Sequence, residues 1–520
     1  MPRIRIDWAL FAILIVAMSF RLYRIDAPYV DAHSWRQVTN ADIARNWAEG
    51  PIQFAKPMVS WGGPDGRVGM EFPLLHLLTA WTWRITGVND AAGRAVAVVF
   101  SVGTVWLLYL VGARLFGRPA GLASAAVLAL SPSNVYFGRT LLSDVPMLFF
   151  SVGAVLGYVI YVQTSSRLAA LLGATSLALA GLVKIPAILV LGPVIWCGII
   201  TRRNRLLADP WFVAAPLAAL GAVFLWYLHA DLLYQETGLT QAIFRPSGTY
   251  PGDIAAWSGP FATVSHWTRA DLLTMDTFWK LTKRFYSLHL TPPVFAAALA
   301  GALFVWRPLP WRTIVDVWAL ASASLVLVSL AGQVPHEFHQ LPTLPPLALY
   351  AGLAMAPVFD ATRWRRLGMM RTVAIPVCAA TAIGYFVFNF RNEYGIRTLY
   401  RADQLGPLMV TAGWAIDLVT PKDALLVTMD YRHGGTNSPM LLYFSHRKGW
   451  SFDAESLLPT VIDYLRRERG ACYFATSDWK ALSESRTDVV EYLADRREVE
   501  LPYTYWQFRL WDLGCSTPGT

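Results

Sequence analysis

Charged residues are scarce in this sequence of 520 residues. Asp, Glu, Lys and Arg make up 15% of it, and hydrophobic residues make up 55%. Soluble domains usually carry about 25% charged residues. The deficit is confined to one part of the chain, because residues 391–520 hold 32 charged residues and residues 1–390 hold the other 47. This distribution excludes a wholly soluble protein. It predicts an α-helical membrane module at 1–390, followed by a soluble domain at 391–520.

Cysteine is also rare. Four cysteines are too few for a disulfide framework. Cys472 and Cys515 both fall in the predicted soluble domain, and they can pair only if that domain lies outside the cytoplasm. The net charge of +9 comes mainly from arginines in the short connections between apolar runs. Orientation in a membrane explains arginines at such places, so we exclude nucleic acid as a partner.

Long apolar runs are what the sequence has in abundance. A membrane helix needs about 20 largely apolar residues, and eleven runs come near that length. They are Trp8–Phe20, Ala95–Ala113, Pro119–Gly138, Val145–Ser166, Leu168–Val183, Ile185–Thr201, Pro210–Ala230, Leu290–Trp306, Val317–Pro335, Gln340–Phe359 and Thr372–Phe390. A cleaved signal peptide is the alternative reading of the first run.

The arginines predict how these spans are oriented. If the N-terminus is cytoplasmic, the inner connections hold most of the arginines, and the short outer connections hold only Arg139 and Lys184. That asymmetry is what the positive-inside rule requires. We therefore expect the C-terminal domain to follow an odd number of spans and to lie outside the cytoplasm.

Two of the outer connections are long, at about residues 25–90 and 231–289. Apolar residues at helical spacing predict helices in the membrane interface at Ala32–Ala48, Pro73–Trp83 and Asp271–Tyr286. Asp31 is placed to cap the first of these helices.

The last 130 residues alternate two kinds of run. The strand-like runs are Ala424–Met429, Met440–Phe444 and Ala471–Ala475, and the helix-like runs are Leu457–Arg469 and Asp488–Arg496. This alternation predicts a small α/β domain.

Ionisable residues gather in the outer connections, although such residues are costly near a membrane and are candidates for function there. They are Asp31, His33, Arg36, Glu71, His76, Arg139, Asp144, Lys184, His336, Glu337 and His339. A carboxylate can accept a proton from an attacking hydroxyl, and cations can hold a phosphate and stabilise it as a leaving group. The combination indicates a phospholipid-type donor and a hydroxyl acceptor.

The order of these features resembles the GT-C glycosyltransferases, especially the branch with the protein O-mannosyltransferases and the lipid A aminoarabinose transferase. The matching stretches are Asp31-Ala-His-Ser-Trp-Arg-Gln37, Ala41-Asp-Ile-Ala-Arg-Asn46, Glu71-Phe-Pro-Leu74, Arg139-Thr-Leu-Leu-Ser-Asp-Val-Pro146 and His336-Glu-Phe-His-Gln-Leu-Pro342. The similarity covers most of the membrane module and extends loosely into residues 413–475. Each motif alone is weak evidence. The resemblance rests on the order of the motifs and on their predicted position at the same side of the membrane.

The resemblance implies a polyprenyl-phosphate sugar donor, bound from the outer leaflet, and inversion at the anomeric carbon. It also implies that Asp31 is the catalytic base. Many relatives have a second acidic residue directly after this position, whereas Ala32 and then His33 follow here. It therefore stays open whether His33 shares the proton transfer or binds substrate.

The candidate site residues fall into three groups, each with a simpler alternative. The candidates are Asp31, Asp144 and His33 for catalysis; Arg36, Arg139, Lys184, His336 and His339 for the donor phosphate; and Glu71, Trp35 and Trp61 for substrate.

Asp31 could instead be a helix cap, Asp144 a cap paired with Arg139, and Glu71 a partner of an arginine. Arg36 and Lys184 could extend to the interface, and the tryptophans could belong to a membrane belt. The histidines with Asp31 could form a metal site, but we expect no metal and no cofactor.

The sequence as a whole predicts an inverting glycosyltransferase in the bacterial plasma membrane. It would move a sugar from a polyprenyl phosphate to a hydroxyl of a glycan, lipid or protein at the outer face. The main alternative is a transporter or flippase for a lipid-linked glycan. It is disfavoured because no internal repeat is visible and the polar groups cluster on one side. A scaffold that binds glycolipid without turnover is a third possibility.

Overall fold

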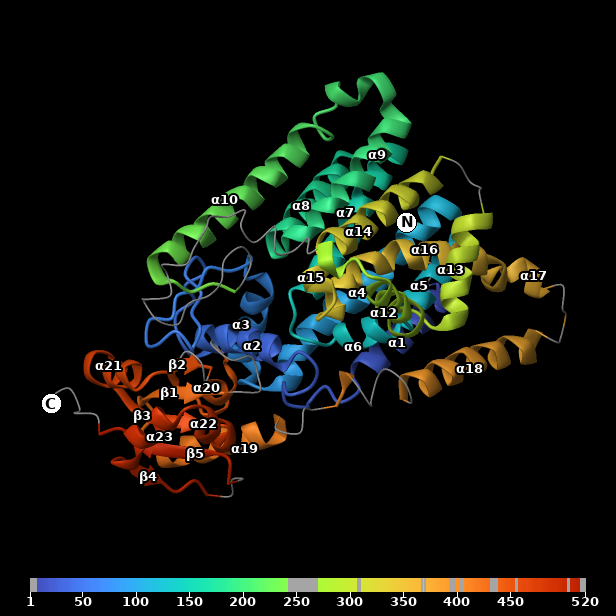
Figure 1. Cartoon of the computed structure of the whole chain (residues 1–520). Coiled ribbons are helices and arrows are strands. Elements are labelled where there is room, and N and C mark those ends of the chain that lie inside the picture. The colour runs from blue at the N-terminus through green and yellow to red at the C-terminus, as the bar shows by residue number, and fades with distance from the viewer. Residues whose placement is uncertain are drawn as a thin grey trace. The chain divides into compact units, whose positions relative to one another are not determined.

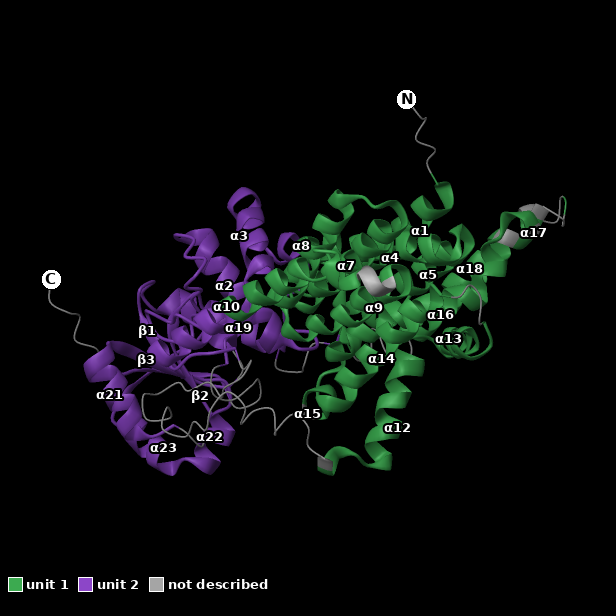
Figure 2. Ribbon diagram, turned by 90° about the horizontal axis from the view of Figure 1, so that it is seen from above, with its two compact units in different colours: residues 1–25, 94–226, 261–400 green, residues 26–93, 227–260, 401–520 purple. Residues whose placement is uncertain are grey.

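The computed structural model describes residues 7–241, 270–305, 310–365, 368, 371–391, 399–401, 406–430, 438–453, 457–502 and 506–514. These residues are mostly helical, and one sheet of five strands lies near the C-terminus (Figure 1). They divide into two compact units (Figure 2). Unit 1 comprises residues 1–25, 94–226 and 261–400, and unit 2 comprises residues 26–93, 227–260 and 401–520. Unit 2 therefore combines the first long connection with the C-terminal residues.

The secondary-structure elements described in unit 1 are all helices, and α4 and α10 each continue into unit 2. Its elements are α1 (Trp8–Arg21), α4 (Asp90–Phe116), α5 (Arg118–Ala129), α6 (Pro132–Phe137), α7 (Asp144–Thr164), α8 (Arg167–Val183), η1 (Ile185–Val190), α9 (Leu191–Arg202), η2 (Arg203–Ala208), α10 (Ala214–Thr237), η4 (Ala270–Leu272), α12 (Met275–Arg284), η5 (Phe285–His289), α13 (Pro292–Phe304), α14 (Arg312–Val328), α15 (Leu330–Gln333), η6 (Glu337–Thr343), α16 (Leu344–Met355), η7 (Ala356–Phe359), α17 (Ala361–Arg365) and α18 (Arg371–Asn389). Each of the eleven apolar runs contains helix.

Several of these helices can cross a membrane. Among the described residues, five are long and apolar enough: Asp90–Phe116, Asp144–Thr164, Ile185–Arg202, Ala214–Thr237 and Glu337–Phe359. The pair Met275–His289 and Pro292–Phe304, bent by 106°, would make a sixth. Trp8–Arg21, Arg167–Val183, Pro376–Asn389 and Gly406–Val419 are shorter apolar helices. The number of about eleven spans stays a prediction.

Helices α7 and α8 are packed backbone to backbone. A Cβ atom on Gly157 would lie 2.4 Å from the Cα atom of Gly173, so no larger residue fits there without a shift. Small residues allow such close approach between helices in a membrane. Helix α8 ends at Val183 and cannot continue through Pro186, because a proline has no backbone N–H to donate and its ring clashes with the carbonyl four residues earlier. Lys184 is thereby left in an extended conformation next to the start of α7.

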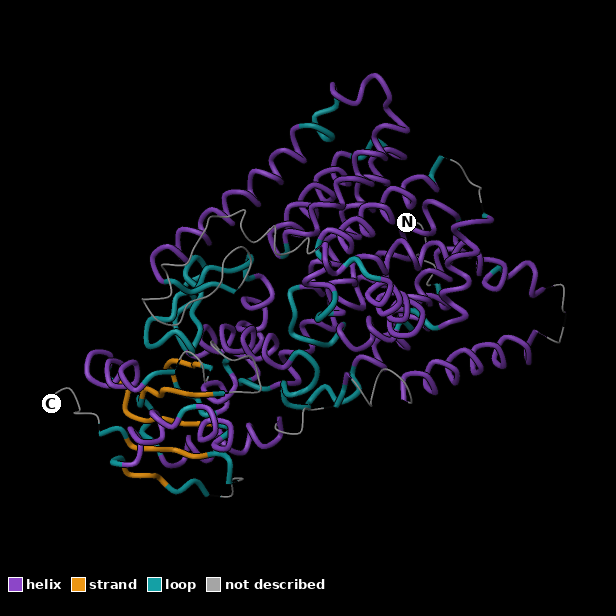
Figure 3. Tube along the Cα trace, viewed as in Figure 1, coloured by secondary structure: helices purple, strands orange, loops and turns teal. Residues whose placement is uncertain are grey.

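Unit 2 contains α2 (Ser34–Glu49), α3 (Leu74–Thr86), α19 (Gly406–Val419) and a five-stranded sheet in the order β2-β1-β3-β5-β4 (Figure 3). Strands β2 (Lys448–Phe452), β1 (Leu425–Met429) and β3 (Ala471–Thr476) are parallel, whereas β5 (Arg509–Asp512) and β4 (Arg497–Val499) pair antiparallel. The helices α20 (Met440–Phe444), α21 (Pro459–Arg469), α22 (Trp479–Ser485) and α23 (Thr487–Ala494) lie between the strands in sequence.

Most of the predicted elements of this region are confirmed, and one is wrong. Strands occur at Leu425–Met429 and Ala471–Thr476, and helices occur at Pro459–Arg469 and Thr487–Ala494. The predicted strand at Met440–Phe444 is the short helix α20, whose five residues are all buried. A short run that is apolar on every side has no period that separates a strand from a buried helix. The prediction that residues 391–520 form a separate domain is not tested by these elements.

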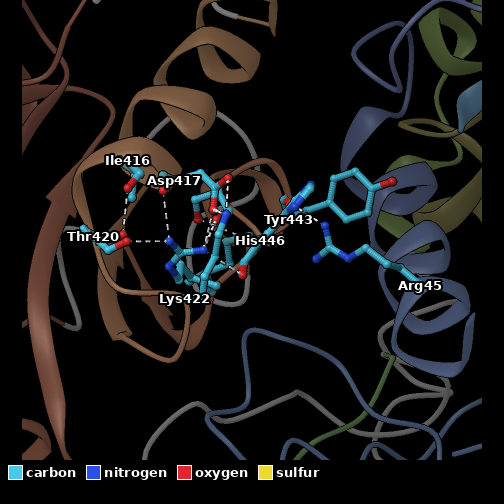
Figure 4. Close-up of polar contacts among 10 residues, drawn as sticks. Arg45, Ile416, Asp417, Thr420, Lys422, Tyr443 and His446 are labelled. Atoms are coloured by element: carbon cyan, nitrogen blue, oxygen red, sulfur yellow. Dashed lines mark hydrogen bonds and ion pairs between the residues drawn. The ribbon is translucent and has the colours of Figure 1, made fainter. Parts of the chain in front are cut away.

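Buried arginines join the segments of unit 2 (Figure 4). The Arg447 side chain is fully buried and donates to the Asp417 carboxylate at 2.5 Å and to the Thr420 carbonyl at 2.8 Å, which caps the end of α19. Arg45 of α2 donates to the Tyr443 carbonyl at 2.6 Å and lies over the ring of Tyr443, 4.2 Å from its centre. The first long connection is thus anchored to the sheet-containing part of the same unit.

Candidate functional site

The predicted site residues belong to both units and are described one unit at a time. Unit 2 contains Asp31, His33, Trp35, Arg36, Trp61 and Glu71, and unit 1 contains Arg139, Asp144, Lys184, His336 and His339.

Asp31 lies just before α2 and is held by a residue of that helix. The Gln37 side-chain nitrogen donates to Asp31 Oδ1 at 2.8 Å and to the Ala32 carbonyl at 2.9 Å. Asp31 is 7% exposed. The residue at the N-cap position is His33, which makes no capping bond with its side chain, so Asp31 does not occupy the predicted cap position. The structure instead positions this carboxylate with a neutral amide.

His33 has a backbone conformation that side-chain-bearing residues rarely adopt. Its φ is +58°, in the left-handed region, where a residue with a Cβ atom costs about 1–2 kcal/mol. Such conformations are found where the surrounding structure enforces them, often at functional sites. Here the conformation turns the chain between the Asp31 carboxylate and the first turn of α2.

Arg36 is fixed by the chain that follows α10. Its Nη1 atom donates to Gln241 Oε1 at 2.8 Å, and the guanidinium lies 5.2 Å from the centre of the Trp35 ring. The backbone N–H of Gln241 donates to the Gly69 carbonyl at 3.1 Å. A Cβ atom on Gly69 would lie 2.2 Å from the Ala230 carbonyl oxygen, so this pairing requires glycine.

The other predicted residues of unit 2 differ in burial. Trp61 is 1% exposed and Trp35 is half-buried. Glu71 is also half-buried and, within the described part of the chain, has no ion pair with an arginine. His76 is 1% exposed, and its Nε2 atom is 3.1 Å from Asn40 Oδ1. Burial, aided by the charge of Arg36, lowers the pKa of His76 to about 3, so its imidazole is neutral near pH 7.

In unit 1 the structure brings together Asp144 and Lys184. Lys184 Nζ lies 2.5 Å from Asp144 Oδ2, and the two side chains are 15% and 3% exposed. Asp144 opens α7 and Lys184 follows α8, so the pair joins two antiparallel helices at one end. The alternative of a cap paired with Arg139 is wrong, because the partner of Asp144 is Lys184.

The two predicted histidines flank the aromatic neighbour of Lys184. Lys184 Nζ is 5.1 Å from the centre of the Phe338 ring. That ring contacts His339 with 4.4 Å between ring centres and His336 with 5.3 Å. His339 Nδ1 is 3.2 Å from the Gly332 carbonyl. Lys184 and the two histidines therefore surround one phenylalanine at the start of η6.

Arg139 is completely buried. It donates to the Arg24 carbonyl at 3.0 Å, and its guanidinium lies 4.3 Å from the centre of the Tyr400 ring and 5.3 Å from that of Tyr136. Cation–π contacts of this kind stabilise a guanidinium away from water.

Two further expectations concern metals and cysteines. The described ranges contain no group of three or more His, Cys, Asp or Glu side chains that could hold a metal ion. Cys515, one half of the possible pair with Cys472, lies outside the described residues.

Sequence reasoning missed the two amides that organise unit 2. Gln37 positions Asp31, and Gln241 positions Arg36. Neither residue is charged, so neither stood out among the ionisable groups of the outer connections. The position of Gln37 in the motif that begins at Asp31 was the one available signal.

Known proteins resemble this chain more in fold than in sequence. Residues 71–243 match the family profile described as dolichyl-phosphate-mannose-protein mannosyltransferase. A search of curated proteins returns no match. ArnT from Cupriavidus metallidurans superposes with a TM-score of 0.61 at 12% identity, over 96% of this chain and 97% of that one. The same protein bound to undecaprenyl phosphate gives a TM-score of 0.60 at 12% identity, over 98% of this chain and 99% of that one. The Archaeoglobus fulgidus oligosaccharyltransferase with Zn and sulfate gives 0.55 at 13% identity, over 94% and 71%.

The chain therefore has the fold of the GT-C glycosyltransferases, which confirms the resemblance predicted from its motifs. The apolar helices agree with a membrane protein of this class. The family profile and the fold together support glycosyltransferase activity in general.

Proposed function

We propose that this protein is an inverting glycosyltransferase that moves a sugar from a polyprenyl phosphate to a hydroxyl group at the outer face of the bacterial plasma membrane. The observation that carries the proposal is the placement of Asp31. Its carboxylate is 7% exposed and is oriented by the Gln37 amide at the start of a helix. The shared fold with ArnT, which has been solved with undecaprenyl phosphate, supports the class of donor.

Asp31 is the general base in this proposal. It accepts the proton of the acceptor hydroxyl as the oxygen attacks the anomeric carbon. The bond from that carbon to the phosphate oxygen breaks, and its electron pair leaves with the polyprenyl phosphate. Attack from the side opposite the leaving group inverts the anomeric carbon. His33, Trp35 and Glu71 contact the sugar or the acceptor.

The basic residues hold the donor phosphate. Lys184 is the central one, because Asp144 fixes its ammonium group at 2.5 Å, and His336 and His339 lie on either side of the adjacent Phe338. Arg36 and Arg139 complete the set. Cations already in place stabilise the negative charge that develops on the leaving group without having to reorganise. The reaction uses no nucleotide and no metal.

The membrane placement follows the distribution of arginines. The N-terminus is cytoplasmic, about eleven spans follow, and residues 391–520 lie outside the cytoplasm. The acceptor hydroxyl belongs to a glycan, a lipid or a protein of the cell envelope.

The test uses the full chain reconstituted in liposomes. Undecaprenyl phosphates that carry different radiolabelled sugars serve as donors, and an envelope extract from a deletion strain serves as the acceptor. The wild-type protein transfers label to the extract. Asp31→Asn keeps the shape but cannot accept the proton, and we expect a loss of roughly 10²–10⁴-fold.

Asp65→Asn is the matched control, because Asp65 lies in the same connection and its side chain is 67% exposed. We expect near-normal transfer. Normal transfer by Asp31→Asn would remove Asp31 as the base. Movement of labelled lipid across the bilayer without transfer would instead establish a flippase, and saturable binding without either would establish a scaffold.

A further inference from the structure

A pocket lies at the far end of α7 from Asp144. Its volume is about 920 Å³, and its lining includes Tyr161, Arg167, Arg202, Asp209 and Trp211. Helix α7 has 21 residues, and a helix rises 1.5 Å per residue, so the two ends are about 30 Å apart. That distance equals the thickness of the hydrocarbon core of a bilayer. The pocket is therefore separate from the Asp144–Lys184 pair and lies at the opposite membrane surface.

The floor of the pocket is held by hydrogen bonds around Asp209. The Tyr161 hydroxyl donates to Asp209 Oδ2 at 2.8 Å, and the Trp211 backbone N–H donates to Asp209 Oδ1 at 3.0 Å. The Tyr158 hydroxyl donates to the Trp211 carbonyl at 2.9 Å. Both oxygens of the carboxylate thus already accept a hydrogen bond, and the turn is fixed before any ligand enters.

Two arginines contribute more positive charge than Asp209 balances. Arg202 Nε lies 3.6 Å from Asp209 Oδ2, beyond hydrogen-bond distance, and this buried nitrogen has no hydrogen-bond partner in the part of the chain that the structure describes. Arg167 is exposed and, among the described residues, makes no ion pair and no hydrogen bond. Guanidinium groups bind the oxygens of a phosphate through paired N–H donors.

Backbone groups add to this preference for an anion. Helix α8 begins at Arg167 and α10 begins at Ala214, and both residues line the pocket. The N-terminal turns of helices present N–H groups without partners inside the helix, together with the positive end of the helix dipole.

The surroundings of the pocket are apolar. Leu168 and Leu172 of α8 are 64% and 57% exposed, and Leu217 of α10 is 61% exposed. In a membrane such surfaces contact acyl chains. Tyr161 and Trp211 have ring centres 6.5 Å apart, and aromatic residues of this kind mark the level of the lipid headgroups. A ligand that suits both the arginines and the leucines has an anionic end and an apolar end.

We propose that this pocket binds the phosphate of an anionic phospholipid in the leaflet opposite the sugar-transfer site. Arg167 and Arg202 hold the phosphate oxygens, and the acyl chains lie along the exposed leucines of α8 and α10. The site is independent of the donor lipid, because the length of α7 separates the two.

The experiment measures the melting temperature of the purified full chain in mild detergent, titrated with phosphatidylglycerol, phosphatidylcholine or inorganic phosphate. We expect saturable stabilisation of the wild-type protein by phosphatidylglycerol alone. In the variant R167Q/R202Q, the phosphatidylglycerol concentration at half-maximal effect should rise at least about 10-fold. Arg114→Gln, at an exposed arginine outside the pocket lining, is the control and should titrate like the wild type.

Three results would overturn the proposal. The first is an unchanged titration of R167Q/R202Q. The second is equal stabilisation by phosphatidylcholine. The third is stabilisation by inorganic phosphate that phosphatidylglycerol does not increase, which would make this a site for a soluble anion. If the double variant does not fold, Arg167→Gln alone decides the matter, because Arg167 has no partner to lose among the described residues. Its titration should shift in the same direction.

Discussion

Two buried carboxylates, one in each unit, accept hydrogen bonds from different kinds of donor. Asp31 of unit 2 receives a hydrogen bond from the neutral amide of Gln37 at 2.8 Å. Asp144 of unit 1 receives one from the ammonium group of Lys184 at 2.5 Å. An amide orients a carboxylate without cancelling its charge, whereas an ammonium group neutralises it. The first arrangement suits a proton acceptor, and the second suits a residue that fixes a cation for phosphate.

The comparison predicts that the largest effect on stability comes from Lys184→Met. Removal of one member of a buried ion pair leaves an uncompensated charge, which costs about 3–5 kcal/mol in the free energy of unfolding. Chemical unfolding of the purified protein measures it. Sugar transfer should fall as well, because the proposed phosphate ligand is lost. Lys422→Met is the control, because Lys422 is 76% exposed and its pair with Asp417 should contribute at most about 1 kcal/mol.

The double variant Asp144→Asn/Lys184→Met sharpens this test. It removes both charges, so most of the lost stability should return while sugar transfer stays low. A double variant that transfers sugar normally would contradict a phosphate role for Lys184. One that is no more stable than Lys184→Met would contradict the explanation by uncompensated charge.

The next effect in size concerns His76, which lies in the same unit as Asp31. Its pKa is about 3 in the folded protein and about 6.5 in the unfolded chain. Above pH 6.5 the residue is neutral in both states and contributes nothing. Below pH 6.5 the unfolded chain binds a proton that the folded protein does not. The free energy of unfolding therefore falls by about 1.4 kcal/mol per pH unit down to about pH 3.

The variant His76→Gln should remove that slope. Between pH 7.5 and pH 4.5, the free energy of unfolding of this variant should fall by about 3 kcal/mol less than that of the wild type. Gln53→Leu, at an exposed glutamine of the same unit that carries no titratable group, should keep the wild-type slope. An unchanged acid sensitivity of His76→Gln would show that His76 is protonated in the folded protein. His76 would then be a second candidate, beside Asp31, for the group whose titration governs the pH dependence of sugar transfer.

The smallest effect is expected from Gln37→Leu. The substitution removes the donor to Asp31. The leucine that replaces Gln37 is of similar size, and its apolar side chain suits a fully buried position. A hydrogen bond to a charged group contributes about 1.5–3 kcal/mol, so kcat should fall about 10-fold or more with little change in KM. Gln53→Leu, at an exposed glutamine, should have normal kcat. A rise in KM at unchanged kcat would mean that Gln37 binds substrate instead of positioning the base.

Much of the helical structure could be predicted from the sequence, because it depends on local patterns. Every apolar run contains helix, and the residues from Ser34 to Glu49 form one at the predicted place. The error at Met440–Phe444 arose where the local pattern was ambiguous, since all five residues are apolar and buried. The candidate site residues could also be chosen from the sequence. A charged residue near a membrane is costly wherever it occurs, so the ionisable residues of the predicted outer connections are candidates for function.

The sequence by itself determined the class of the protein, through the length of its apolar runs and the order of its motifs. These properties depend on the free energy of transfer of each side chain from water to lipid, which follows from the residue type alone. The tertiary structure alone decided which groups are partners. Lys184 pairs with Asp144 from 40 residues away, and Gln241 binds Arg36 from 205 residues away. Such pairings depend on how helices pack, on close approaches such as that of Gly157 to Gly173, and no local pattern encodes them.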